Sequence, residues 1–154
     1  PYIHGGGKIG VMVRAESPAG AIPEILAAAK DCALQVAAMN PPYLKREDVP
    51  AAVLDEEKKI ILAQMAEDPK MANKPEQVKE KIAAGKVGKY YGENCLLEQA
   101  FVKENKETVQ SYVDGVAKAA GTTIAITDFV RFERGEGIEK KADNFAEEIA
   151  SMIK

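Results

Sequence analysis

The chain has 154 residues, a formal net charge of -3 and a hydrophobic content of 46%. A chain of this size can bury roughly 70% of the surface that its unfolded form exposes, so we expect one compact domain without disulfide support. No face of the chain is obviously basic, which disfavours nucleic acid as a main partner. No apolar run is long enough to span a membrane and no signal peptide is recognisable, so the sequence favours the cytoplasm and no membrane partner.

A glycine-rich turn near the start separates two short apolar segments. Its motif Gly5-x-Gly7-x-x-Gly10 matches a dinucleotide-binding fingerprint, in which a strand leads into the glycines and a helix follows them. Here residues 9–15 alternate between apolar and other side chains, which predicts a strand and therefore a β-hairpin. A nucleotide-binding enzyme that uses this turn is the alternative. His4, the only histidine, lies at the edge of the turn, and the residues alone leave its role open.

Helical patterns fill the next part of the chain. Apolar residues from Ile22 to Val36 recur at helical spacing, and this stretch ends before Pro41 and Pro42. Residues 51–93 contain two charged helical stretches with a thin apolar stripe, so we expect an inserted antiparallel helical hairpin that projects from the domain. Its acidic side chains and its lysines are equal in number, which indicates a solvated surface rather than an RNA-binding arm. The stripe consists of Val53, Ile60, Ile61, Met65, Val78, Ile82 and Val87.

The second half of the chain predicts another helix and the segment with the strongest β character. We expect a helix over residues 106–119, with Asn105 as its N-cap. Gly121 ends that helix, and residues 124–133 are rich in β-branched and aromatic side chains, which predicts a third strand. A short C-terminal helix is predicted for residues 138–154.

Together these elements predict an α+β fold for residues 1–154 as one domain. A small three-stranded antiparallel sheet would carry helices on one face, and the antiparallel helical hairpin would protrude from it. Cys32 falls on the apolar stripe of the first helix and is expected to be buried. Neither Cys32 nor Cys95 has the neighbours of a zinc site, and the sequence predicts no metal, no cofactor and no catalytic group.

Three further segments carry a resemblance to a known family. They are "YIHGGGKIGVMV", "LLEQAFVKENKETV" and "FVRFERGEGIEKKADNFAEEIA". In this order they resemble the Tyr-x-His-Gly-x-x-x-Gly-Val, Leu-x-x-Gln-x-Phe-Val and Arg-Phe-x-x-Gly-Glu-Gly-Ile-Glu segments of the translation elongation factor Ts family. Between the first two segments the family has a helix and an antiparallel coiled coil, where hydrophobic spacing independently predicts them here. The resemblance covers residues 2–154 and only the second half of the family's length.

The resemblance implies a function and a partner. It implies that the chain is part of a guanine-nucleotide exchange factor, not an enzyme, that binds elongation factor Tu and promotes GDP release during translation elongation. A structural module that self-associates as a homodimer through its small sheet is an alternative of a different class. The two functions can be told apart by sedimentation, because a purely structural homodimer would not change its oligomeric state when elongation factor Tu is added.

The resemblance also implies residues that bind elongation factor Tu. The matching positions are His4, Gly5, Gln99, Phe101, Val102 and Lys103. Ala100 replaces a proline common in the family, and Lys103 replaces a more apolar residue. From the residues alone, Phe101 fits a core position as well as an exposed one, whereas the resemblance favours an apolar anchor at the interface.

The family's other core subdomain has a Cys-x-Thr-Asp-Phe-Val motif, whose Asp and Phe disturb the nucleotide site of elongation factor Tu. The "TDFV" of this chain, residues 127–130, lies in the predicted last strand and in the other subdomain's position. We therefore expect Phe129 or Val130 to pack into the core, and the motif is not assigned that role.

Overall fold

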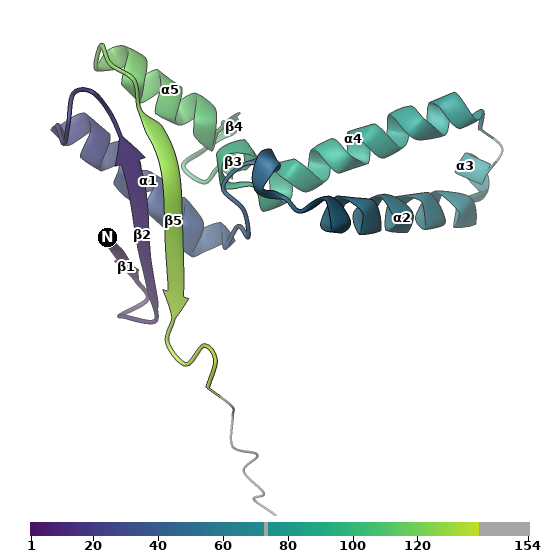
Figure 1. Ribbon diagram of the computed structural model, residues 1–154, viewed down its shortest axis with the longest axis horizontal. Helices are drawn as coiled ribbons and strands as arrows, with labels where there is room; N and C mark the ends of the chain where they lie inside the picture. Colours follow the sequence, from purple (N-terminus) through teal and green to yellow (C-terminus); the bar gives the residue numbers. More distant parts are fainter. Residues whose placement is uncertain (73, 139–154) are drawn as a thin grey trace, which may run out of the picture.

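The computed structural model describes residues 1–72 and 74–138 of the chain (Figure 1). In chain order, the core elements are β1 (Tyr2–His4), β2 (Ile9–Glu16), α1 (Pro23–Met39), β3 (Ala100–Phe101), β4 (Glu104–Thr108), α5 (Val109–Ala119) and β5 (Ala125–Glu133). Between α1 and β3 lie the short 3-10 helix η1 (Arg46–Asp48), then α2 (Ala51–Glu67), α3 (Pro69–Ala72), α4 (Glu76–Asn94) and the 3-10 helix η2 (Leu96–Glu98). Within the described residues, no helix is long and apolar enough to cross a membrane.

The main sheet is three-stranded and antiparallel, with strand order β1-β2-β5. Its register pairs Val11 of β2 with Tyr2 on one side and with Arg131 on the other. Val11 points toward the core and is buried, whereas Met12 points to the opposite face and is exposed, as the period of two in the sequence requires. The predicted α+β fold with its small antiparallel sheet is confirmed.

The glycine-rich turn joins β1 to β2, so that a strand follows the glycines. Gly5, Gly6 and Gly7 have φ values of 60, 64 and 89°, a backbone region that other residues rarely adopt. The amide of Lys8 closes the turn on the carbonyl of Gly5, with an N–O distance of 3.4 Å. In the described part of the chain a strand, and not a helix, follows the glycines, and the hairpin prediction is confirmed.

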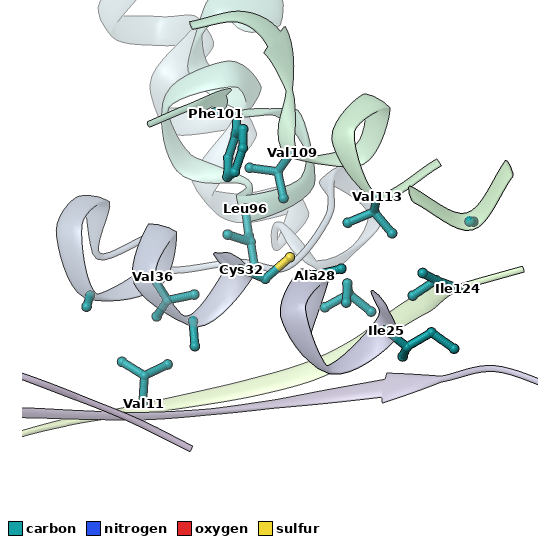
Figure 2. Close-up of a cluster of buried hydrophobic side chains, with 14 residues drawn as sticks. Val11, Ile25, Ala28, Cys32, Val36, Leu96, Phe101, Val109, Val113 and Ile124 are labelled. Carbon is teal, nitrogen blue, oxygen red and sulfur yellow. The ribbon is translucent and has the colours of Figure 1, made fainter. Parts of the chain in front are cut away.

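Helix α1 is the centre of the hydrophobic core. One side of it packs against the sheet through Val36 and Val11, and the other side packs against Leu96, Phe101 and other residues from η2, β3 and α5 (Figure 2). Figure 2 shows the strands on one side of α1 and these later segments on the other. The buried position predicted for Cys32 is confirmed. Helix α1 ends where Asn40 adopts a left-handed conformation with a φ of 46°.

Helices α2 and α4 form the antiparallel hairpin that projects from the core (Figure 1). Ile61 and Met65, one turn apart on α2, are buried on its seam. Ile60 and Val78 are exposed, so their predicted places on the seam were wrong. Adjacent helical residues point about 100° apart, and the position of Ile61 therefore turns Ile60 away from α4.

The start of α5 differs from the sequence prediction. The helix begins at Val109, and its N-cap is Thr108, whose side-chain oxygen accepts a hydrogen bond from the amide of Ser111 at 3.2 Å. Asn105 lies in β4, which pairs with β3, so the predicted N-cap was wrong. Phe129 of β5 packs partly buried against the core, as one of the two alternatives expected. From residue 139 on, the predicted C-terminal helix lies outside the described residues.

Candidate functional site

The structure places the predicted partner-binding residues in two separate groups. His4 and Gly5 lie at the turn between β1 and β2, at the end of the sheet far from α5 (Figure 1). The other four lie in the contact segment, which we define as residues 99–103, beside the base of the helical hairpin. No hydrogen bond or ion pair between described residues joins the two groups. They would therefore have to contact a partner at two places.

The first group is fully accessible. The imidazole of His4 is exposed, and its Nδ1 lies 3.0 Å from the hydroxyl of Tyr2. The two rings are tilted by 35°, with centroids 5.8 Å apart. Gly5 is exposed and begins the run of positive φ. The contact with Tyr2 holds the imidazole of His4 at the edge of the sheet without burying it.

The contact segment is divided into an inner and an outer pair of side chains. Gln99 and Phe101 are 1% and 2% exposed, whereas Val102 is 40% exposed and Lys103 is also exposed. In the free chain, therefore, Val102 and Lys103 are the accessible members of this predicted group. Binding of elongation factor Tu by any of these residues stays a prediction.

Phe101 belongs to the core of the free chain. Its ring stacks on Tyr112, with centroids 4.2 Å apart and an interplanar angle of 18°. The hydroxyl of Tyr112 donates a hydrogen bond to Asp31 Oδ2 at 2.7 Å. Burial, followed by this hydrogen bond, raises the pKa of Tyr112. Asp31 also forms an ion pair with Lys103, so one carboxylate on α1 holds both the inner and the outer side of the segment.

A buried amide network connects the contact segment to α1. The Gln35 Nε2 atom donates hydrogen bonds to Gln99 Oε1 and to the carbonyl of Ala100, each at 3.1 Å. The Gln35 Oε1 atom accepts a hydrogen bond from the amide of Val102 at 2.9 Å. Gln99 Nε2 in turn donates to the carbonyl of Glu93 in α4, at 2.9 Å. The network therefore reaches from α1 through the contact segment to the end of the helical hairpin.

The sequence analysis missed Gln35. It lies one turn after Cys32 and beside Val36, so it is a polar residue on an otherwise apolar stripe. That position was the available signal, because a fully buried amide needs hydrogen-bond partners. The sequence could not identify those partners, since they lie about 65 residues further along the chain.

The base of the helical hairpin is fixed at the same place. The guanidinium of Arg46 donates two hydrogen bonds to the Glu98 carboxylate, at 2.7 and 2.6 Å, and lies 4.9 Å from the centroid of the Tyr91 ring. The hydrogen bond to Glu98 is the main cause of the raised pKa of Arg46. The amide of Leu96 donates to the carbonyl of Tyr43 at 2.9 Å, so the chain that enters the hairpin pairs with the chain that leaves it.

The described part of the chain holds no group of three His, Cys, Asp or Glu residues arranged to bind a metal ion. Its two thiols are buried. Burial, with a smaller effect of Asp31, raises the pKa of Cys32 to about 12. Burial, followed by the charge of Glu98, raises the pKa of Cys95 to about 11. Both thiols are therefore protonated at neutral pH, which makes them poor nucleophiles and poor metal ligands.

The outer face of the sheet, opposite α1, is apolar and exposed. We use this name for Ile3, Met12, Val130 and Phe132, which are all exposed. The register pairs Met12 with Val130 and places Phe132 opposite Gly10, so the four side chains extend across all three strands. A contiguous exposed apolar surface of this kind is typical of an interaction site.

Comparison with known proteins identifies relatives along almost the whole chain. The family model described as Elongation factor TS matches residues 1–136. A protein of Clostridium kluyveri named Elongation factor Ts is 48% identical over 153 residues, which cover 99% of this chain and 48% of that protein. A protein of the same name from Syntrophotalea carbinolica is 44% identical, with 99% and 49% covered. The chain thus spans about half the length of the curated relatives that it matches.

Proposed function

This chain belongs to the elongation factor Ts family, and we propose that it is part of a guanine-nucleotide exchange factor that binds elongation factor Tu and promotes GDP release during translation elongation. The family match over residues 1–136 is the observation that carries the proposal. An exchange factor performs no covalent chemistry, because it acts by binding its nucleotide-free partner more tightly than the nucleotide-bound one. By linkage, the nucleotide and the factor then weaken each other's binding by the same ratio.

Within this function, the accessible residues make the direct contacts. His4 and Gly5 contact elongation factor Tu from the β1–β2 turn, and Val102 and Lys103 contact it beside the base of the helical hairpin. Exposure of these four residues in the free chain supports this assignment. Gln99 and Phe101 act from inside the fold, because their buried side chains anchor the contact segment from which Val102 and Lys103 are exposed.

We propose that the chain by itself contributes mainly to the affinity for elongation factor Tu and only slightly to the acceleration of GDP release. It spans about half of its relatives, and its "TDFV" lies in β5, where Phe129 packs against the core. Contacts that are equally favourable with the GDP-bound and the empty partner tighten binding but do not change the release rate. We therefore expect binding with only slight acceleration of GDP release.

Stopped-flow release of a fluorescent GDP analogue from elongation factor Tu tests this function. The chain is added at increasing concentration, and complex formation is followed in parallel by sedimentation. The proposal predicts a complex and a small, saturable acceleration. Absence of a complex at concentrations of tens of micromolar, a range that detects weak binding, would overturn the proposal. Exchange as fast as with a full-length relative would instead overturn the division between affinity and exchange.

A second candidate function is self-association as a structural module. The outer sheet face supports it, because Met12 and Phe132 are 53% and 62% exposed to solvent. Sedimentation of the chain over a range of concentrations, with and without elongation factor Tu, separates the candidates. A dimer that Phe132→Glu disrupts and that ignores elongation factor Tu would favour this second function.

A further inference from the structure

Gln35 is a fully buried polar side chain, and three hydrogen bonds join it to the contact segment. Two of them involve backbone groups, the carbonyl of Ala100 and the amide of Val102. These groups lie on either side of Phe101. The side-chain amide of Gln35 therefore bridges the backbone directly before Val102. A side chain that binds the backbone at two points fixes a segment's path more strongly than one that packs against its side chains.

The contact segment needs such support because its own secondary structure is short. Strand β3 has two residues, and its pairing with β4 shifts register between Ala100 and Phe101. An irregular ladder of this length cannot determine the backbone conformation of the residues that follow it. The hydrogen bond from the Val102 amide to Gln35 replaces a ladder bond at the point where the strand ends.

Asp31, one helical turn before Gln35, acts on the same segment through side chains. Its carboxylate pairs with Lys103 and accepts a hydrogen bond from the hydroxyl of Tyr112, on whose ring Phe101 stacks. Residues four apart on a helix lie on one face, so Asp31 and Gln35 together present one polar surface of α1 to the contact segment. Gln35 holds the backbone and Asp31 holds the outer lysine.

We propose that Gln35 is a positioning residue for the binding of elongation factor Tu, which acts by holding Val102 and Lys103 in the conformation that the partner contacts. This inference rests on the proposed function. If the segment leaves that conformation when Gln35 is lost, the apparent association constant is the intrinsic one multiplied by the fraction of time that the competent conformation is populated. A segment that is competent a tenth of the time binds about tenfold more weakly.

The test compares Gln35→Met with the matched control Val36→Ala, by calorimetric titration of nucleotide-free elongation factor Tu. Both residues are fully buried neighbours on α1, but Val36 packs in the hydrophobic core near the sheet (Figure 2). All titrations are done at a temperature at which circular dichroism shows each variant folded. We expect Gln35→Met to weaken binding about tenfold and Val36→Ala to change it less than twofold, an effect of positioning rather than stability. Equal affinities for Gln35→Met and the unmodified chain would overturn the inference.

Local order supplies a readout that does not depend on the partner. In Gln35→Met the amide of Val102 loses its acceptor, so its hydrogen exchange should accelerate strongly while the amides of β2 and β5 stay protected. Unchanged exchange at Val102 would overturn the inference. If the unmodified chain does not bind elongation factor Tu, the proposed function fails, and the inference fails with it. Binding by the unmodified chain with no loss in Gln35→Met contradicts the inference alone.

A second variant covers the case in which Gln35→Met does not fold, and its folding is first checked at about pH 5.5, where a protonated carboxyl buries no charge. The Gln35→Glu side chain keeps an oxygen that can accept the hydrogen bond from the Val102 amide. As a carboxylate, however, it cannot donate hydrogen bonds to the carbonyl of Ala100 or to Gln99 Oε1. Protonation at lower pH restores one donor, so its affinity relative to the unmodified chain should rise as the pH falls from 8 toward about 5.5. A ratio that stays constant over this range would contradict the role assigned to Gln35.

Discussion

The rings of Phe101 and Tyr112 stack at a centroid distance of 4.2 Å, which places Phe101 inside the core beside the accessible Val102. Replacing Phe101 with Asp should therefore unfold the domain, because an unpaired charge would be buried. Phe101→Ala should lower the free energy of unfolding by about 3 to 5 kcal/mol. Urea denaturation followed by circular dichroism measures both effects.

Phe101→Leu is the matched control, since it keeps an apolar side chain and should retain a cooperative transition. A folded Phe101→Asp variant with normal stability would contradict the core position. If that folded variant also failed to bind elongation factor Tu, Phe101 would be a direct anchor of the partner instead.

The helical hairpin is expected to be dispensable for folding of the core. The last residues of the hairpin are bound to the core, because the carbonyl of Glu93 accepts a hydrogen bond from the side chain of buried Gln99, and Tyr91 lies against Arg46. We predict that a chain lacking residues 55–88, closed by a short Gly-Ser linker, keeps a cooperative thermal transition. Differential scanning calorimetry checks this.

The deletion of residues 55–93 serves as the comparison for the shorter one. It also replaces Tyr91 and the last turn of α4 with flexible linker, so that no helix holds a carbonyl against the buried side-chain amide of Gln99, and this variant should be less stable. Loss of the transition in the shorter deletion would mean that the hairpin is part of the folding core.

The buried thiols predict a loss of stability at alkaline pH. Burial raises the pKa of Cys95 to about 11 and that of Cys32 to about 12, against an ordinary value of 9.0. Below pH 9 the thiols keep their protons in the folded and in the unfolded chain. Above pH 9 the unfolded chain loses these protons first, so the free energy of unfolding falls as the pH rises toward 11. The raised pKa of Tyr112 adds to the same loss.

Urea denaturation between pH 7 and 10.5 measures this slope. Cys95→Ala should be less stable at every pH but should show a shallower decline above pH 9, because one of the titrating groups is gone. An identical slope would show that the Cys95 thiol ionises equally in both states. Iodoacetamide should leave both thiols unmodified in the native chain at pH 8 and should alkylate them in urea.

The sequence predicted the elements whose patterns are local. Alternation in residues 9–15 identified β2, and helical spacing with Pro41 and Pro42 identified α1 and its end. It failed for β4, because "ENKET" has neither alternation nor β-branched residues until its end, and pairing with β3 determines its conformation. The position of Thr108 as N-cap follows from that pairing and was therefore not predictable.

A role of residues 99–103 in binding elongation factor Tu rests on the resemblance and stays a prediction, whereas their accessibility follows from the tertiary structure alone. The structure divides the segment into buried Gln99 and Phe101 and accessible Val102 and Lys103. Gln35 contacts both the buried and the accessible part of the segment, and these contacts reach far across the sequence. Side-chain exposure in a short irregular strand is decided by its distant partners and has no local pattern.

The most direct measurement of the central claim is a calorimetric titration of nucleotide-free elongation factor Tu with the unmodified chain, Val102→Asp and Val78→Asp. Val102 and Val78 are 40% and 38% exposed, so both variants should stay folded, but Val78 lies on the projecting hairpin. Our account predicts binding by the unmodified chain and by Val78→Asp, and at least about tenfold weaker binding by Val102→Asp, which corresponds to about 1.4 kcal/mol. Equal affinities for all three chains, or no binding by the unmodified chain, would contradict it.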